Sequence, residues 1–91
     1  MKKRLILKVK GQVQGIGYRY AVQKEAKRRG FTGYVKNTDA GGVEIVAEGD
    51  ERDLQNFILF CYNGVVNAVV QKIDESRSEA TGAFSDFVIR Y

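Results

Sequence analysis

The order of hydrophobic patterns along the chain constrains its fold more strongly than any other feature. Apolar residues alternate over residues 4–10, which predicts a half-buried strand, and from Tyr18 onward they recur at helical spacing. Gly30 stands where that helix would end, and Asp50 is a good N-cap for a second helix. The expected elements, in chain order, are a strand at 4–10, a helix from Tyr18 that Gly30 ends, strands at 31–36 and 43–48, a helix from Asp50 to Gly64, and strands within 68–75 and 84–91.

This order, β-α-β-β-α-β with one further strand, predicts an α+β fold, the ferredoxin-like split βαβ sandwich. We expect a mixed, mostly antiparallel sheet that carries both helices on one face. A helical crossover joins the first two strands, so these strands run parallel and their C-terminal ends share one edge of the sheet. Asn37 ends the second strand. With one strand between them, the two ends would stand roughly 10 Å apart.

The composition describes a single globular domain over residues 1–91 with no metal site and no cofactor. The chain has no histidine and one cysteine, Cys61. That cysteine shares the apolar stripe of the second predicted helix with Leu54, Phe57 and Ile58, so core packing is its expected role. No apolar run approaches the length that spans a membrane, and the N-terminus does not resemble a signal peptide. We therefore expect a cytoplasmic protein that does not bind membranes. A monomer is also expected, although the sequence itself does not fix the oligomeric state.

Positive charge is concentrated in the first part of the chain. The first 36 residues contain eleven of the 15 Lys and Arg residues, but only one, Glu25, of the 11 Asp and Glu residues. This asymmetry favours an anionic partner, although a solvated helix face accounts for part of it. Nucleic acid is not the expected partner. RNA-binding modules of this fold stack bases on aromatic residues of the central strands, and residues 5–10 and 43–48 contain none.

The segment between the first strand and the first helix, residues 11–19, is the most informative motif. Gly15 and Gly17 lie where the strand gives way to the helix, and Arg19 lies at the helix start. Glycine permits the left-handed conformations that let successive N–H groups point into one concavity, where the positive end of the helix dipole adds to them. An arginine supplies a forked, permanently charged donor for phosphate oxygens. The motif therefore predicts a phosphate cradle.

Other interpretations of these residues remain open from the sequence. The motif is not a dinucleotide fingerprint, because Tyr20 stands in place of the third glycine, and it is not a Walker loop. Arg19 could be an ordinary surface residue, although a positive charge in a first helical turn opposes the helix dipole. Asn37 could be a turn residue, since asparagine suits a hairpin start and a left-handed conformation. A regulatory domain of the same fold without turnover is a further alternative.

Four segments together resemble one known family. They are Gly11-Gln-Val-Gln-Gly-Ile-Gly-Tyr-Arg19, Gly33-Tyr-Val-Lys-Asn37-Thr-Asp, Gly42-Val-Glu-Ile-Val-Ala-Glu-Gly49 and Phe84-Ser-Asp-Phe-Val-Ile-Arg90. Over essentially its whole length the chain is similar to acylphosphatases. The resemblance implies hydrolysis of acyl phosphates to a carboxylate and inorganic phosphate, with phosphate or sulfate as inhibitory ligands. It also implies that Arg19 binds the phosphate and that Asn37 positions water. The implied cradle consists of the backbone amides of Gln14, Gly15, Ile16, Gly17, Tyr18 and Arg19.

The parts present in the chain suffice for that reaction. The leaving group is a carboxylate whose conjugate acid has a pKa near 4, so it departs without a proton. The transition state of phosphoryl transfer is largely dissociative, so the water needs positioning more than deprotonation. What remains is to bind the phosphoryl oxygens, which backbone amides and one guanidinium group can do. The absence of histidine and of an evident catalytic carboxylate pair is therefore no obstacle.

Overall fold

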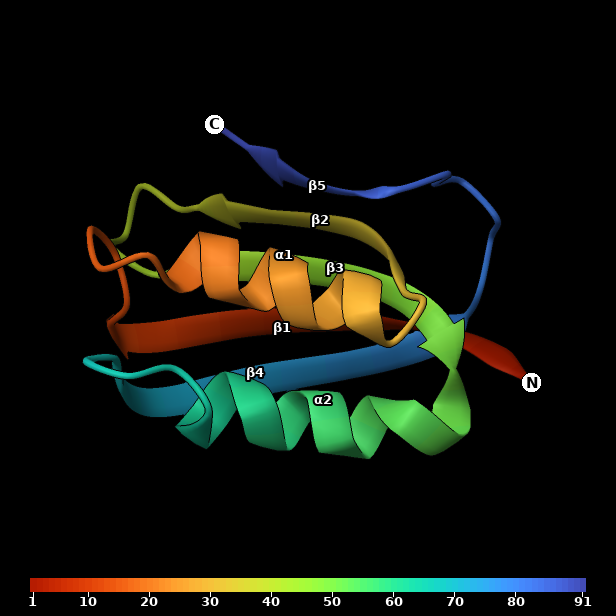
Figure 1. Cartoon of the computed structure of the whole chain (residues 1–91), viewed down its shortest axis with the longest axis horizontal. Helices are drawn as coiled ribbons and strands as arrows, with labels where there is room; N and C mark the ends of the chain where they lie inside the picture. The colour runs from red at the N-terminus through yellow and green to blue at the C-terminus, as the bar shows by residue number, and fades with distance from the viewer.

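The computed structural model describes all of residues 1–91, and its helices and strands follow one another in the expected order (Figure 1). The elements are β1 (Lys2–Gln12), α1 (Tyr18–Arg28), β2 (Thr32–Asn37), β3 (Val43–Asp50), α2 (Glu51–Asn63), β4 (Val69–Glu79) and β5 (Phe87–Arg90). The longest helix has 13 residues, and no helix is long and apolar enough to cross a membrane.

The five strands form one mixed sheet in the order β4-β1-β3-β2-β5. β1 pairs antiparallel with β3 and β4, and β2 pairs antiparallel with β3, so β1 and β2 run parallel with β3 between them. β5 lies parallel to the outer side of β2, with Arg90 opposite Lys36. The predicted fold class is confirmed. The topology also brings the C-terminal ends of β1, β2 and β5 to one edge of the sheet.

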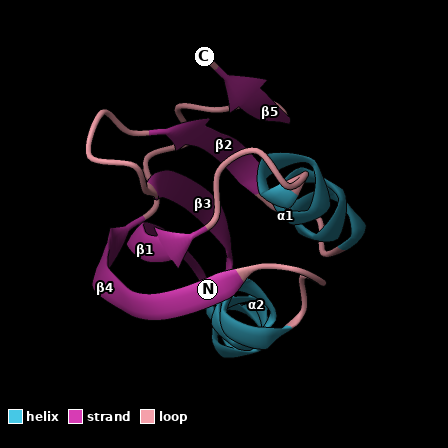
Figure 2. Ribbon diagram, turned by 90° about the vertical axis from the view of Figure 1, so that its left-hand side faces the viewer, coloured by secondary structure: helices cyan, strands magenta, loops and turns pink.

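Both helices lie on the same face of the sheet (Figure 2). The core fills the space between them and the strands. β1 contributes its alternating apolar residues, α1 contributes Val22 and Ala26, and α2 contributes the predicted stripe. The most deeply buried of these side chains are Leu5, Leu7, Val9, Val22, Ala26, Leu54, Phe57 and Cys61. The alternation in β1 and the helical spacing in α1 and α2 are therefore explained by burial of one face of each element.

Two strands are longer than the sequence pattern predicts. β1 begins at Lys2 and continues to Gln12, where the pattern supported only residues 4–10. β4 runs to Glu79 rather than ending by residue 75, because its second half pairs with β1, with Lys3 opposite Glu79. The added residues of β4 are polar and exposed, so they carry no hydrophobic alternation. Backbone pairing with β1 defines this part of the strand.

The helix ends agree with the predicted signals. Asp50 caps α2, since its side chain accepts a hydrogen bond from the Arg52 N–H at 3.0 Å, and Gly64 is the C-cap of the same helix. α1 ends at Arg28, two residues before Gly30. At its other end α1 has no side-chain cap, because the N-cap position is Gly17. The first N–H groups of α1 are therefore left without a side-chain partner at the junction that the sequence singled out.

The connection between β4 and β5 is pinned to the centre of the sheet by Glu48 of β3. The Glu48 carboxylate accepts hydrogen bonds from Arg4 Nε at 2.7 Å, from the Thr81 N–H and hydroxyl at 3.0 Å each, and from the Gly82 N–H at 3.0 Å. Glu48 is only 4% exposed and is the one charged side chain in the buried set. Because buried charges are tolerated only when they are paired and hydrogen-bonded, this network fixes the path of the chain into β5.

Candidate active site

The loop between β1 and α1 presents a run of backbone N–H groups that are open to a ligand. Gly15 and Gly17 have φ values of 76° and 81°, in the left-handed region. None of the hydrogen bonds within the protein uses the backbone N–H of residues 14–17, and the first N–H groups of α1 have no intrahelical partner. The space beside both glycines is empty to 4 Å. This geometry is an anion nest continued by a helix N-terminus.

Arg19 occupies the first turn of α1 without an acidic partner. That turn contains no acidic residue, and Arg19 takes part in no salt bridge of the structure. Its guanidinium carbon lies 4.8 Å from the centre of the Tyr91 ring, and Nη1 donates a long hydrogen bond of 3.5 Å to the Arg90 carbonyl. Stacking on an aromatic ring orients the guanidinium while its charge stays unpaired. The side chain is therefore positioned to bind an anion.

A hollow of about 170 Å³ lies between the cradle loop and the end of β5. Its lining residues are Val13, Gly15, Gly17, Tyr18, Arg19, Tyr20, Ile89 and Tyr91. No sequence motif places Tyr91 at this hollow. It lies there because β5 runs parallel to β2, so the last residues of the chain reach the same edge of the sheet as Asn37. Only the pairing of β5 with β2 reveals that neighbourhood.

Asn37 is the last residue of β2 and stands opposite Val43. It has no positive φ, and the following turn is closed by Thr38, whose N–H donates to the Gly42 carbonyl at 2.9 Å and whose hydroxyl accepts from the Gly42 N–H at 3.1 Å. The Asn37 side chain takes no part in these bonds. Its Oδ1 is buried and has no hydrogen-bond partner. A buried polar atom without a partner costs about 1–3 kcal/mol, so turn formation does not account for this asparagine.

The cradle and the turn after Asn37 lie at the same end of the molecule (Figure 1). One side chain joins them: Gln14 Nε2 donates to the Thr38 carbonyl at 3.0 Å and to the Gly42 carbonyl at 2.8 Å. The sequence motif predicts a role for the Gln14 backbone amide, not for its side chain. No local pattern signals this contact, because residues 14 and 38 come together only through the parallel arrangement of β1 and β2.

Tyr18, Cys61 and Glu25 are held in their neutral or paired forms. Burial raises the pKa of Tyr18, whose hydroxyl donates to the Cys61 carbonyl at 2.8 Å, and burial raises the pKa of the Cys61 thiol to about 12. Glu25 pairs with Arg28 and Arg29, and the hydrogen bond from Arg28 lowers the pKa of its carboxyl. None of these groups is arranged as a base or nucleophile at neutral pH.

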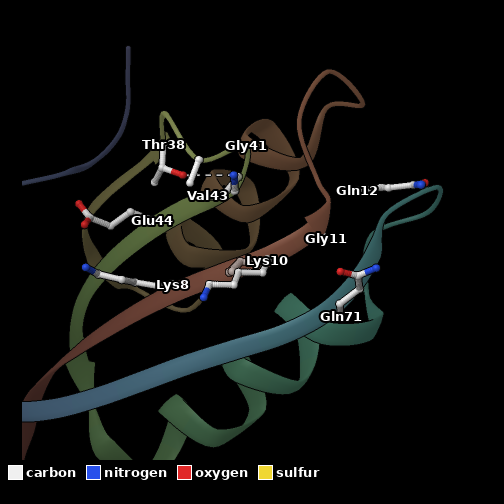
Figure 3. Close-up of a pocket in the computed structure, with 12 residues that line it drawn as sticks. Lys8, Lys10, Gly11, Gln12, Thr38, Gly41, Val43, Glu44 and Gln71 are labelled. Atoms are coloured by element: carbon white, nitrogen blue, oxygen red, sulfur yellow. Dashed lines mark hydrogen bonds between the residues drawn. The ribbon is translucent and has the colours of Figure 1, made fainter.

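No group of three or more His, Cys, Asp or Glu side chains in the structure is arranged to hold a metal ion. The largest hollow, about 570 Å³, lies beside the cradle over β1, β3 and the β2–β3 turn (Figure 3). Of the charged side chains that line it, Lys10 pairs with Asp74 and Glu44 pairs with Lys36 and Tyr34, whereas Lys8 has no ionic partner. Its walls are paired strands whose backbone N–H groups are largely used within the sheet. The smaller hollow at the cradle therefore offers an anion more unpaired backbone N–H groups than the larger one does.

Comparison with known proteins identifies the family. A family model described as acylphosphatase matches residues 5–89. The chain is 43% identical to the acylphosphatase of Bacillus subtilis, whose crystal structure superposes with a TM-score of 0.91 and full coverage of both chains. It is also 43% identical to an acylphosphatase of Caldanaerobacter subterraneus subsp. tengcongensis. That alignment spans 89 residues and covers 98% of this chain and 99% of the relative. A Coxiella burnetii acylphosphatase structure is 30% identical, covers 98% and 93% of the two chains, and has a TM-score of 0.89.

These matches extend over the whole sheet, both helices and the loops that carry the candidate site. The chain therefore belongs to the acylphosphatase family, the enzymes that hydrolyse acyl phosphates. The resemblance drawn from its motifs is confirmed.

Proposed function

We propose that this protein hydrolyses the carboxyl–phosphate bond of acyl phosphates with a site made of the 14–19 amides, Arg19 and Asn37. The amides of Gln14 to Arg19 and the Arg19 guanidinium hold the phosphoryl oxygens, and Asn37 positions the attacking water. The observation that carries the proposal is the run of unpaired N–H groups beside an arginine that has no acidic partner. The Asn37 side chain makes no hydrogen bond within the protein, which leaves its carboxamide available for the second half of the proposal.

The chemistry needs only binding and positioning. Negative charge on the equatorial oxygens is stabilised by donors that are oriented before the reaction, which costs no reorganisation during the transfer. The planar fork of Arg19 binds two oxygens at once. The carboxylate product leaves unprotonated. No step requires Tyr18, Cys61 or Glu25, and none requires a metal ion. We therefore expect the same rate of phosphate release in the presence of EDTA.

The role of Arg19 is tested by comparing Arg19→Lys and Arg19→Ala. Lysine keeps the charge but loses the fork, so both variants should lose turnover and phosphate affinity to a similar degree. Arg52 provides a matched control, because it is the second residue of α2 as Arg19 is the second residue of α1, and its side chain is exposed. Arg52→Lys should keep wild-type kinetics. Full activity of Arg19→Lys would show that charge alone suffices.

The role of Asn37 is tested by separating turnover from binding. Loss of one preorganised contact to the transition state typically costs on the order of 10²–10³ in rate, so Asn37→Ala should lose kcat by this factor with little change in KM. Inhibition by inorganic phosphate should be unchanged. Asn56→Ala, at an exposed position of α2, is the control for loss of a carboxamide. A folded Asn37→Ala protein with wild-type kcat would contradict the proposed role.

Inorganic phosphate and sulfate should act as competitive inhibitors, since each offers the same oxygens to the cradle. All elements of the proposed site come from one chain, so a monomer suffices for activity. Size-exclusion chromatography at assay concentrations, combined with an activity measurement, tests this expectation. Activity confined to an oligomeric fraction would contradict it.

A further inference from the structure

The Gln14 side chain makes the only hydrogen bonds between the cradle loop, residues 13–17, and the β2–β3 turn, residues 38–42. Its Nε2 donates to the Thr38 carbonyl at 3.0 Å and to the Gly42 carbonyl at 2.8 Å. The backbone of residues 13–16 contributes no bond to that turn or to any other loop. The loop is otherwise held by its connections to β1 and α1 and by apolar packing, with Val13 in the core and Ile16 against it. The Gln14 carboxamide is therefore its only hydrogen-bonded link to the turn.

The two carbonyls that Gln14 contacts belong to the bonds that shape the turn. The Thr38 carbonyl also accepts from the Gly41 N–H at 3.1 Å, and the Gly42 carbonyl also accepts from the Thr38 N–H at 2.9 Å. A carbonyl oxygen has two lone pairs, so each can accept a second donor. Thr38 directly follows Asn37 in the chain. The position of Asn37 relative to the cradle is therefore set on one side by the sheet and on the other by Gln14.

The bridge requires an NH₂ group. Both acceptors are carbonyl oxygens, and a primary carboxamide offers two N–H donors from one nitrogen. A glutamate carboxylate in the same place would offer two acceptors to two acceptors. A methionine has a similar length and shape but no donor. These differences make the contribution of the hydrogen bonds separable from that of the side-chain volume.

We propose that Gln14 is a positioning residue for acyl phosphate hydrolysis: its carboxamide fixes the distance between the phosphate cradle and the water held by Asn37. This inference rests on the proposed function of the cradle and Asn37. A misplacement of about 1 Å between reacting groups can cost on the order of 10²-fold in rate. Loss of the bridge should therefore lower kcat, whereas the remaining cradle amides and Arg19 keep the affinity for phosphate.

Three variants test the proposal: Gln14→Met, Gln14→Glu and the control Gln12→Glu. Gln14 is exposed, so its replacement leaves the core intact and the variants should fold. Gln12 is also exposed, lies two residues earlier at the end of β1, and its side chain makes no hydrogen bond to the β2–β3 turn. Gln12→Glu thus introduces the same negative charge near the site without touching the bridge. It controls for repulsion of an anionic substrate.

The measurements are kcat and KM for benzoyl phosphate and the inhibition constant of inorganic phosphate. For Gln14→Met we expect kcat to fall about 10- to 100-fold, with the inhibition constant within about threefold of wild type. Gln14→Glu should lose more kcat than Gln14→Met, because it places acceptors against acceptors, and Gln12→Glu should keep kcat. The NMR signals of the amides of residues 15–19 should still respond to phosphate in Gln14→Met.

Wild-type kcat in Gln14→Met would overturn the inference, as would parallel losses of kcat and phosphate affinity, which would indicate a role in the cradle itself. These outcomes are distinguishable from failure of the proposed function. If Arg19→Lys loses activity and Gln14→Met does not, only the inference about Gln14 fails. If Arg19→Ala and Asn37→Ala both retain full activity, the proposed site fails as well.

Discussion

Replacement of Glu48 by glutamine should destabilise the protein in a way that depends on pH. Burial alone would raise the pKa of Glu48, but hydrogen bonds from Thr81, Gly82 and Arg4 outweigh it and lower the pKa from 4.5 to about 2. A difference of one pKa unit corresponds to 1.36 kcal/mol, so this shift is worth ~3 kcal/mol of folding free energy at neutral pH. The total free energy of unfolding of a native protein is roughly 5–15 kcal/mol. Glu48 therefore accounts for a substantial share.

The direction of the pH dependence follows from the lowered pKa of Glu48. Because the pKa in the folded state is lower than in the unfolded state, the stabilisation is fully present above about pH 4.5 and is lost as the pH falls toward 2. Glutamine is neutral at every pH and has no such dependence. The difference in unfolding free energy between wild type and Glu48→Gln should thus be ~3 kcal/mol at pH 7 and should shrink steadily between pH 4.5 and pH 2.

Urea unfolding of both proteins at pH 7, 4.5, 3 and 2, followed by circular dichroism, measures this difference. Other carboxylates titrate in both proteins, so their contributions cancel. Glu75→Gln, at an exposed position of β4, controls for loss of one negative charge and should change stability by less than about 0.5 kcal/mol. A difference between wild type and Glu48→Gln that is the same at pH 7 and pH 2 would refute the reasoning.

Three further predictions follow from single residues. Gly17→Ala forces a φ of 81° on a residue with a Cβ, which costs ~1–2 kcal/mol, so the cradle should relax and the inhibition constant of phosphate should rise; unchanged phosphate inhibition would argue against the nest. Asp50→Ala removes the N-cap bond to Arg52 and should lower the melting temperature by about 4–8 °C without changing kcat, and an unchanged melting temperature would show that the cap contributes nothing. Burial raises the pKa of the Cys61 thiol to about 12, so a thiol reagent at pH 8 should modify it only after unfolding in urea; rapid modification of the native protein would contradict its burial.

Local patterns were sufficient to predict the element order, the fold class and most of the core. Alternation in β1 and the helical spacing of Leu54, Phe57, Ile58 and Cys61 report burial directly, because one face of each element meets the same core. The second half of β4 was missed, since its residues are exposed and its identity as a strand depends on pairing with β1. Where a strand is defined by backbone pairing with a distant segment, its exposed side chains show no hydrophobic alternation that would predict it.

In the candidate site, too, the residues that are close in sequence were predicted, whereas the contacts between distant segments were not. Gly15, Gly17 and Arg19 lie within a few residues of one another, so one segment of sequence was enough to predict the cradle. From the sequence, Asn37 could be a turn residue or a site residue. In the structure Thr38 closes the turn and Asn37 Oδ1 has no partner, which supports the proposed role. The Gln14 bridge and the stacking of Tyr91 on Arg19 depend on which strands lie side by side. Neither contact follows from residue spacing.

The central claim, that residues 14–19 bind the phosphoryl group, is tested most directly by titrating the protein with inorganic phosphate and following every backbone amide by ¹⁵N–¹H NMR. The account predicts that the largest shifts occur at the amides of Gln14 to Arg19, saturate with a single dissociation constant, and disappear in Arg19→Ala at the same phosphate concentration. Shifts centred instead on Lys8, Lys10 and Gln71, around the larger hollow of Figure 3, would contradict it.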